Sequence, residues 1–249
     1  MQVFRGRESR AIHSVFNLRH AAFQDVRVRR ALLGYGLDRQ AIAKMALLGL
    51  AQLLWSFVPP GSWGHLDVGD QFPYAPEQAK ALLTEAGYNA THPLRYTLMI
   101  PGADSLLATV ATIMKAQYTR LGVKVMVEIL DRSIFLRRLT WDRNWDQLLQ
   151  VSGETFDLEA AIRLIDTRTG HNTPNHQDVQ VNALIDHLKQ TATEEAYRKA
   201  GHDLQRYVTE QMLYQSVTTL PLIQAARASV QGYAYGDPIR FETTWLDKP

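Results

Sequence analysis

Residues Leu94–Leu130 read LRYTLMIPGADSLLATVATIMKAQYTRLGVKVMVEIL, and this stretch decides the fold class. Its beginning, LRYTLMI, is mostly apolar, and its end, VKVMVEIL, alternates apolar with polar residues, so both ends are typical of strands. Between them, Asp104 can cap a helix whose apolar residues recur at spacings of three and four and which Gly122 ends. A strand, a helix and a strand with short connections predict two parallel strands joined by a right-handed crossover.

The same pattern continues on the C-terminal side of this stretch. Asp131 can cap a short helix, and Trp145–Val151 reads as a third strand, which completes a βαβαβ core. One further strand is expected near each end of the chain, at Ile12–Leu18 and at Val217–Ile223, where Pro221 interrupts it. We therefore predict one α/β domain with a mostly parallel sheet.

Helices are expected to cover this sheet. Asp25, Asp38 and Pro76 are start signals, because an aspartate can accept from free first-turn amides and a proline at the first position loses no hydrogen bond. The tail after Gly232 shows no periodicity and is predicted to be irregular. The expected helices are Val26–Leu33, Arg39–Leu48, Pro76–Gly87, Leu158–Ile165, Val179–Lys189 and Glu194–Met212.

Composition excludes several classes of function. The 249 residues include no cysteine, which excludes disulfides, thiol nucleophiles and zinc–thiolate sites. A net charge of +2 predicts no nucleic-acid binding, and no apolar run is long enough to span a bilayer. The N-terminal MQVFRGRESR lacks the features of a signal peptide. No nucleophile elbow, P-loop, dinucleotide fingerprint or zincin motif is present, so we expect neither an enzyme nor a cofactor.

Six short motifs are spread along the chain: DVRVRRAL from Asp25, DRQAI from Asp38, PPGSWG from Pro59, LGVKV from Leu121, VQGY from Val230 and TWLD from Thr244. Together they resemble the extracellular solute-binding proteins of ABC importers, in family 5, whose members carry peptides, nickel complexes and opines. The motifs occur in the order of that family, in the second half of a chain about twice this long. The sequence thus resembles the C-terminal half of such a protein.

The resemblance implies a periplasmic-binding-protein-like lobe with crossing strands at both ends. Residues 1–20 would form an N-terminal segment and crossing strand, 21–216 the α/β lobe, and 217–249 a return strand and tail that belong to a missing or partner lobe. It also implies a peptide-like solute, an ABC permease as partner, and a periplasmic or extracellular location. The alternative is a diverged, freestanding lobe that acts as an interaction subunit of a larger assembly, with another protein chain on its exposed interface. Such an apolar interface is expected near Phe16, Phe23 and Leu220–Ile223.

Candidate solute-binding residues follow from the same resemblance. Aligning from the downstream helix places Glu154 at the position whose carboxylate pairs with a peptide ammonium group in the family, with Asp157 three residues later. The family's tryptophan and Asp–Pro element are absent here, and these carboxylates can instead favour the N-terminus of the next helix. Trp63 and His65 lie in the glycine-rich loop, where aromatic residues often line clefts; Trp63 can equally fill the core of the lobe.

A metal site is not expected. His171 and His176 bracket the loop sequence HNTPNH, and two imidazoles could approach one metal ion there. The sequence offers no compelling third ligand, and a metal site needs three or four.

Overall fold

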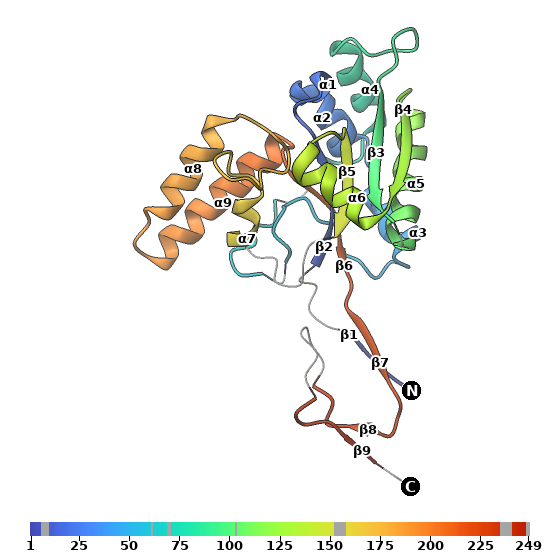
Figure 1. The fold of residues 1–249 in the computed structure, drawn as a ribbon, viewed down its shortest axis with the longest axis vertical. Coiled ribbons are helices and arrows are strands. Elements are labelled where there is room, and N and C mark those ends of the chain that lie inside the picture. Colours follow the sequence, from blue (N-terminus) through green and yellow to red (C-terminus); the bar gives the residue numbers. More distant parts are fainter. Residues whose placement is uncertain are drawn as a thin grey trace.

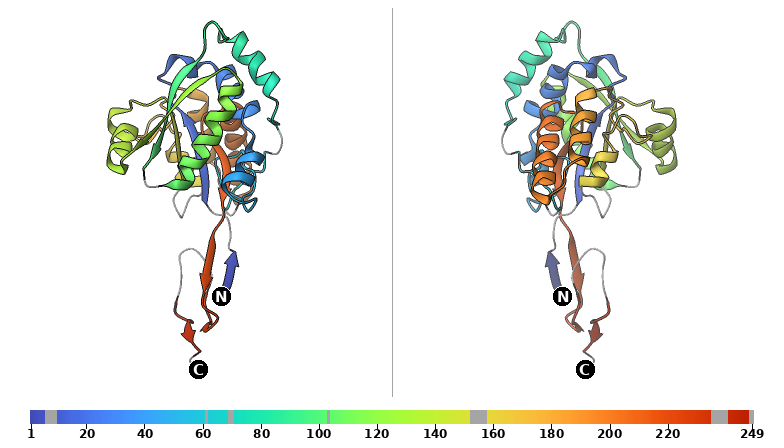
Figure 2. Two further views of the ribbon diagram at one scale, coloured as in Figure 1. Left: turned by 90° about the vertical axis from the view of Figure 1, so that its right-hand side faces the viewer. Right: turned by 90° about the vertical axis from the view of Figure 1, so that its left-hand side faces the viewer.

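The protein was analysed as a computed structural model that describes residues 1–5, 10–60, 62–68, 71–102, 104–151, 158–234 and 241–247. Figure 1 shows an α/β lobe from which a narrow arm extends, and both views in Figure 2 show the same separation. The N-terminus and the C-terminal residues both lie in the arm. None of the helices within the described ranges is long and apolar enough to cross a membrane.

A five-stranded mixed sheet forms the centre of the lobe. Its strand order is β4-β3-β5-β2-β6, and β3 pairs in parallel with both β4 and β5, as the sequence predicts. The N-terminal strand β2 is inserted between β5 and β6 and is antiparallel to both. The strands are β2 (Arg10–Phe16), β3 (Arg95–Pro101), β4 (Lys124–Leu130), β5 (Gln147–Val151) and β6 (Gln215–Leu220).

Helices cover both faces of this sheet. Successive residues of a strand point to opposite faces, and β3 has buried apolar residues on each face. Leu98 is buried in one apolar cluster together with α5 residues, whereas its neighbour Met99 is buried in a second cluster with residues of α7, α8 and α9. The helices are α1 (Ala21–Gln24), α2 (Val26–Arg29), α3 (Arg39–Ala46), α4 (Pro76–Glu85), α5 (Ser105–Arg120), α6 (Arg132–Arg137), α7 (Leu158–Arg163), α8 (Val179–Lys189) and α9 (Glu194–Glu210), with π-helical turns η1 (Arg30–Tyr35) and η2 (Arg138–Asp142).

The predicted helix starts are confirmed by their capping bonds. Asp25 accepts from Arg27 N, and Asp38 accepts from Ala41 N, each at 2.8 Å. Asp104 and Asp131 cap α5 and α6 in the same way. The regular helix expected over Val26–Leu33 is wrong in its second half, where the chain forms the π-helical turn η1.

The arm consists of two short antiparallel pairs. β1 (Gln2–Arg5) pairs with β7 (Ile223–Ala226), and β8 (Val230–Gln231) pairs with β9 (Trp245–Leu246). The prediction of an irregular tail after Gly232 is therefore wrong for β9. Pro221 lies between β6 and β7 and separates the lobe from the arm, so the predicted interruption at this residue is confirmed.

Exposed apolar side chains gather on this arm rather than on the lobe residues that the sequence suggested. Phe16 and Phe23 are fully buried and stack at 4.2 Å between ring centroids, so the expected interface near them is wrong. The aromatic core of the lobe needs both rings, because Tyr96 packs edge-on against each of them. The large apolar side chains exposed on the arm are those of Met1, Val3, Ile223, Phe241, Trp245 and Leu246.

Candidate functional site

A cavity of about 550 Å³ lies at the carboxyl ends of the parallel strands β3 and β5. The N-terminal turns of α5 and α6, the first residue of β2 and the last residue of β6 complete its wall. This is the end of the sheet from which the chain leaves for the arm. Ligands of open α/β sheets bind outside the carboxyl ends of the strands, so this cavity is the candidate solute site.

The cavity is lined by both apolar and polar side chains. Its apolar wall comes from Pro101, Leu106, Leu107, Phe135, Leu136, Val151 and Leu220. Its polar groups are Arg10, Asp104, Arg132 and Gln150. Asp104 Oδ1 accepts from the backbone amides of Leu106 and Leu107 at 3.1 Å each, so this carboxylate is directed at the start of α5. The Gln150 amide donates to the Tyr214 hydroxyl at 3.0 Å.

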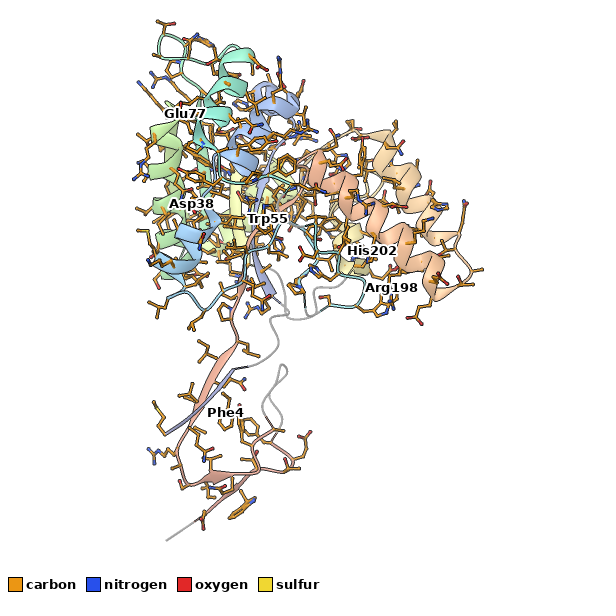
Figure 3. The ribbon with its side chains drawn as sticks, turned by 180° about the vertical axis from the view of Figure 1, so that it is seen from behind. Phe4, Asp38, Trp55, Glu77, Arg198 and His202 are labelled. Carbon is orange, nitrogen blue, oxygen red and sulfur yellow. The ribbon has the colours of Figure 1, made fainter. Side chains whose placement is uncertain are left out.

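Trp63 lies on the surface of the lobe and is absent from both core clusters, with 47% of its area exposed. Its ring centroid is 5.4 Å from that of Tyr197, and the Arg198 guanidinium lies 5.8 Å from the Trp63 ring. Tyr197 also donates a hydrogen bond to Glu159. Figure 3 shows Arg198 and His202 at the edge of the lobe nearest the arm. Trp63 therefore offers a partly exposed aromatic face on this edge.

His65 supports the loop from within. Its Nδ1 lies 2.7 Å from the carbonyl oxygen of Val58, which can only accept, so Nδ1 carries the proton. Burial lowers the pKa of His65, with the Val58 carbonyl opposing that shift. The neutral histidine therefore holds the loop together through its hydrogen bond to the Val58 carbonyl.

Gln205 of α9 fixes the same loop from the other side, and its side chain is fully buried. Its Oε1 accepts from Ser56 Oγ at 2.8 Å and from Leu66 N at 3.0 Å. Its Nε2 donates to the carbonyls of Gly64 at 2.7 Å and Gly201 at 3.1 Å. The sequence does not point to Gln205, because its three partners in the loop lie more than a hundred residues away along the chain.

The predicted residues are not all brought together. Glu154 and Asp157 lie outside the described residues, and Trp63 and His65 are not among the described residues that line the cavity. The residues Arg10 and Arg132 were missed. The position of Arg132 in the sequence could have pointed to the site, because it follows the carboxyl end of a predicted parallel strand and comes directly after Asp131.

The two loop histidines do not share a metal ion. His176 is buried, its Nε2 lies 2.7 Å from the Ile165 carbonyl, and its Nδ1 accepts from Asp178 N at 3.1 Å. Both ring nitrogens are therefore used, whereas His171 is exposed. Over the ranges that the structure describes, no group of three or more histidine or acidic side chains could hold a metal ion.

The sequence of this chain matches a known protein family. Residues 1–170 match the family described as bacterial extracellular solute-binding proteins, family 5 Middle. The chain is 26% identical over 226 residues to Di/tripeptide-binding protein 2 of Pseudomonas aeruginosa, covering 89% of this chain and 42% of that protein. It is 25% identical over 238 residues to a probable deoxycholate-binding periplasmic protein of Escherichia coli, covering 90% of this chain and 42% of that protein.

Solved structures share the fold. The oligopeptide-binding protein AppA of Bacillus subtilis, in complex with a nonapeptide, superposes with a TM-score of 0.86 at 20% identity, over 99% of this chain and 52% of that one. The murein tripeptide-binding protein MppA of Escherichia coli superposes with a TM-score of 0.87 at 19% identity, over 100% of this chain and 50% of that one. The chain thus spans about half the length of the proteins it matches. With the match to residues 1–170, the chain belongs to the bacterial extracellular solute-binding proteins of family 5.

Proposed function

We propose that this chain is a non-catalytic solute-binding component of an ABC importer and that it supplies the C-terminal lobe of a two-lobed receptor. The proposal has residues 21–216 as the lobe, residues 1–20 as the entering strand, and residues 217–249 as a return strand and tail that pack on the second lobe. A peptide-like solute would lie between the lobes, and the closed form would be read by the permease in the periplasm or outside the cell.

The cavity at the carboxyl ends of β3 and β5 is the observation that carries this proposal. It combines an apolar wall with a small number of charged groups, as sites for small solutes do. It also lies where β2 and β6 pass towards the arm, so a second lobe attached there would close over it. The named relatives, which include binding proteins for dipeptides and tripeptides, support a peptide-like solute.

A titration of the 249-residue chain with a dipeptide such as Leu-Leu, followed by amide chemical shifts, tests solute binding. We expect weak, saturable shifts at Leu106, Leu136 and Val151, because one lobe leaves the solute half solvated. The alanine variant of Leu136, whose side chain is exposed, should weaken binding without loss of the fold. Absence of any localised shift at millimolar peptide would reject the solute-binding role.

A second candidate function rests on the arm. Its exposed apolar side chains, which include Phe241 and Trp245, are the kind of surface that another polypeptide covers. A freestanding lobe would then act as an interaction subunit of a larger assembly. A pull-down with the intact chain, run beside mass spectrometry for co-purified small molecules, separates the two roles, because only the importer role predicts a solute that raises thermal stability.

A further inference from the structure

We propose that the outer edge of strand β4 is a docking site for an extended acidic segment of another polypeptide, which adds to the sheet as a further strand. The described lining of the solute cavity includes no residue of β4, so this site is separate from that cavity. The inference therefore goes beyond the proposed function and does not depend on it.

β4 is an edge strand of the five-stranded sheet. In the order β4-β3-β5-β2-β6 it has β3 on one side, and no other described strand pairs with it. Figure 1 shows β4 at the outer side of the lobe. The edge of a sheet carries backbone amides and carbonyls that can pair with a strand of another chain.

The hydrogen bonds to β3 show which backbone groups of β4 point inwards. Lys124 N donates to the Leu94 carbonyl at 2.9 Å, and the Leu130 carbonyl accepts from Gly102 N. In a strand the direction of these groups alternates from one residue to the next. The backbone groups of Lys124, of Leu130 and of every second residue between them therefore face β3.

The other residues of β4 direct their backbone N–H and C=O groups away from the sheet. These residues are Val125, Val127 and Ile129, and no described residue forms a hydrogen bond with their outward groups. Edge strands are often protected from pairing by a proline or a bulge. β4 contains no proline, and its register with β3 is continuous over the whole strand. An added strand can therefore align along its full length.

The side chains at the amino end of β4 make this edge positive. A surface hollow of about 560 Å³ is lined there by three basic residues, Arg95, Lys115 and Lys124, and its described lining contains no carboxylate. All three side chains are exposed, and none forms a salt bridge with a residue that the structure describes. An anionic partner would supply the charges that these cations lack.

The carboxylates close to this edge are already engaged. Glu128 of β4 pairs with Arg138 at 2.6 Å. Asp146 Oδ2 accepts from Thr97 N at 2.8 Å, and Asp146 directly precedes β5, so this carboxylate lies on the side of β3 away from β4. A second copy of β4 would bring a further Lys124 and a Glu128 that is already paired. The charges therefore favour an acidic segment as the occupant.

The two faces of β4 define the pattern of that segment. Lys124 lies opposite Arg95 in the parallel pair, so their basic side chains share one face of the sheet. Ile129, which is 61% exposed, lies on the other face. A strand in which acidic and apolar residues alternate would place its carboxylates beside the basic residues and its apolar side chains beside Ile129. This is strand addition with charge selection.

The peptide Ac-Glu-Val-Glu-Val-Glu-NH2 tests the docking site on the 249-residue chain. Hydrogen exchange of the chain alone should be fast at Val127 and slow at Met126, whose amide faces β3. The peptide should slow exchange at Val127 and shift its amide resonance. We expect the peptide to bind about fivefold more tightly than the same peptide with glutamine in place of glutamate. N-methylation of both valines should abolish binding, because it removes amides that would pair with β4.

Variants of the chain separate the backbone from the charge. Val127→Pro removes an outward amide but no hydrogen bond to β3, and it should prevent binding. Lys124→Gln and Lys115→Gln should each reduce the preference for glutamate over glutamine. Lys199→Gln is the control, because Lys199 is exposed on α9 and does not line the hollow, and it should leave the preference unchanged. Circular dichroism checks each fold, and the two exposed lysines carry the test if Val127→Pro unfolds.

Four results would overturn the proposal. Equal affinity for the glutamate and glutamine peptides would remove the charge selection, and tight binding of the N-methylated peptide would exclude strand addition. Resonance shifts confined to Leu106 and Leu136 would place the peptide in the solute cavity, which supports the proposed function but rejects the docking site. Protection of Val127 that rises with the concentration of the chain alone would show that a second copy covers the edge.

Discussion

Gln205 Oε1 lies 3.0 Å from the backbone nitrogen of Leu66, and this hydrogen bond ties the loop that carries Trp63 to helix α9. The same side chain donates to the Gly64 carbonyl at 2.7 Å, on the other side of His65. One buried amide therefore holds two points of a short loop, and α9 sets the position of the Trp63 ring.

The variant Gln205→Leu should destabilise the lobe by about 3 kcal/mol, because it leaves the Leu66 amide and the Gly64 carbonyl without their partners in a buried place. Urea unfolding measures this loss, and hydrogen exchange at Leu66 should become faster. The control is Gln78→Leu on the exposed face of α4, which should stay within about 0.5 kcal/mol of the wild type. A stable Gln205→Leu protein with slow exchange at Leu66 would contradict the role of this amide.

His13 makes the stability of the lobe depend on pH. Burial lowers the pKa of His13 to about 3 in the folded chain, against 6.5 for the unperturbed side chain. Because the pKa is lower in the folded chain, the unfolded chain binds the proton first as the pH falls. The contribution of neutral His13 to the free energy of unfolding is therefore complete above pH 6.5 and is lost as the pH falls from 6.5 towards 3. We expect His13 alone to account for about 2 kcal/mol of lost stability between pH 7 and pH 5.

Urea unfolding at both pH values measures this effect. The variant His13→Gln should be less stable at pH 7 but should lose less stability on acidification than the wild type. Ser216→Ala is the control, because it removes the hydroxyl 3.0 Å from His13 Nδ1 and keeps the imidazole. Its loss on acidification should match that of the wild type. An unchanged pH slope in His13→Gln would show that His13 does not titrate as expected.

The arm predicts self-association of the isolated chain. Phe241 and Trp245 are 65% and 57% exposed, and they extend from a ribbon that has no further strand beside it among the described residues. The double variant Phe241→Ser, Trp245→Ser should reduce binding of a hydrophobic dye and shift sedimentation at high concentration towards the monomer. The free energy of unfolding of the lobe should stay within about 0.5 kcal/mol.

Trp141→Ser is the matched control for the arm. Trp141 is 85% exposed, but it lies on the lobe in η2. This variant should retain the dye binding and the concentration dependence of the wild type. If both variants reduce dye binding and self-association equally, the arm is not the surface through which the chain associates.

Arg143 and Asn175 should be energetically coupled. Both have positive φ angles, and Arg143 Nη1 donates to Asn175 Oδ1 at 2.5 Å. Arg143→Ala should cost about 2 kcal/mol, because Asn175 and the Asn172 carbonyl lose a charged donor. A double-mutant cycle with Asn175→Ala, measured by urea unfolding, should give a combined loss smaller than the sum of the two single losses. Additive losses would contradict the coupling.

Local features of this fold could be predicted from the sequence. The caps at Asp104 and Asp131 depend on residues two or three positions away, and the parallel pairing of β3 with β4 follows from one short crossover. The π-helical turn η1 was not predicted, and its packing involves residues far from it in the sequence. A side chain on Gly34 would meet Met212 and Phe72 at 3.1 Å, so η1 packs closely against distant segments.

Pairings between distant segments could not be predicted. β1 pairs with β7 across more than two hundred residues, and only the folded chain brings them together. The candidate site has the same difficulty, since Arg10 and Arg132 both line the cavity but are more than a hundred residues apart in the sequence. Trp63 was identified from its glycine-rich loop, but the sequence could not say that Tyr197 and Arg198 would lie beside its ring.

The passage from lobe to arm has a mechanical consequence. Arg10 opposes Leu220 in the sheet, and Arg5 opposes Ile223 in the ribbon, so the described residues are paired on the lobe side and on the arm side of this passage. A bend between these two sets of pairs would leave both of them intact, so the passage is compatible with hinge motion of the arm against the lobe.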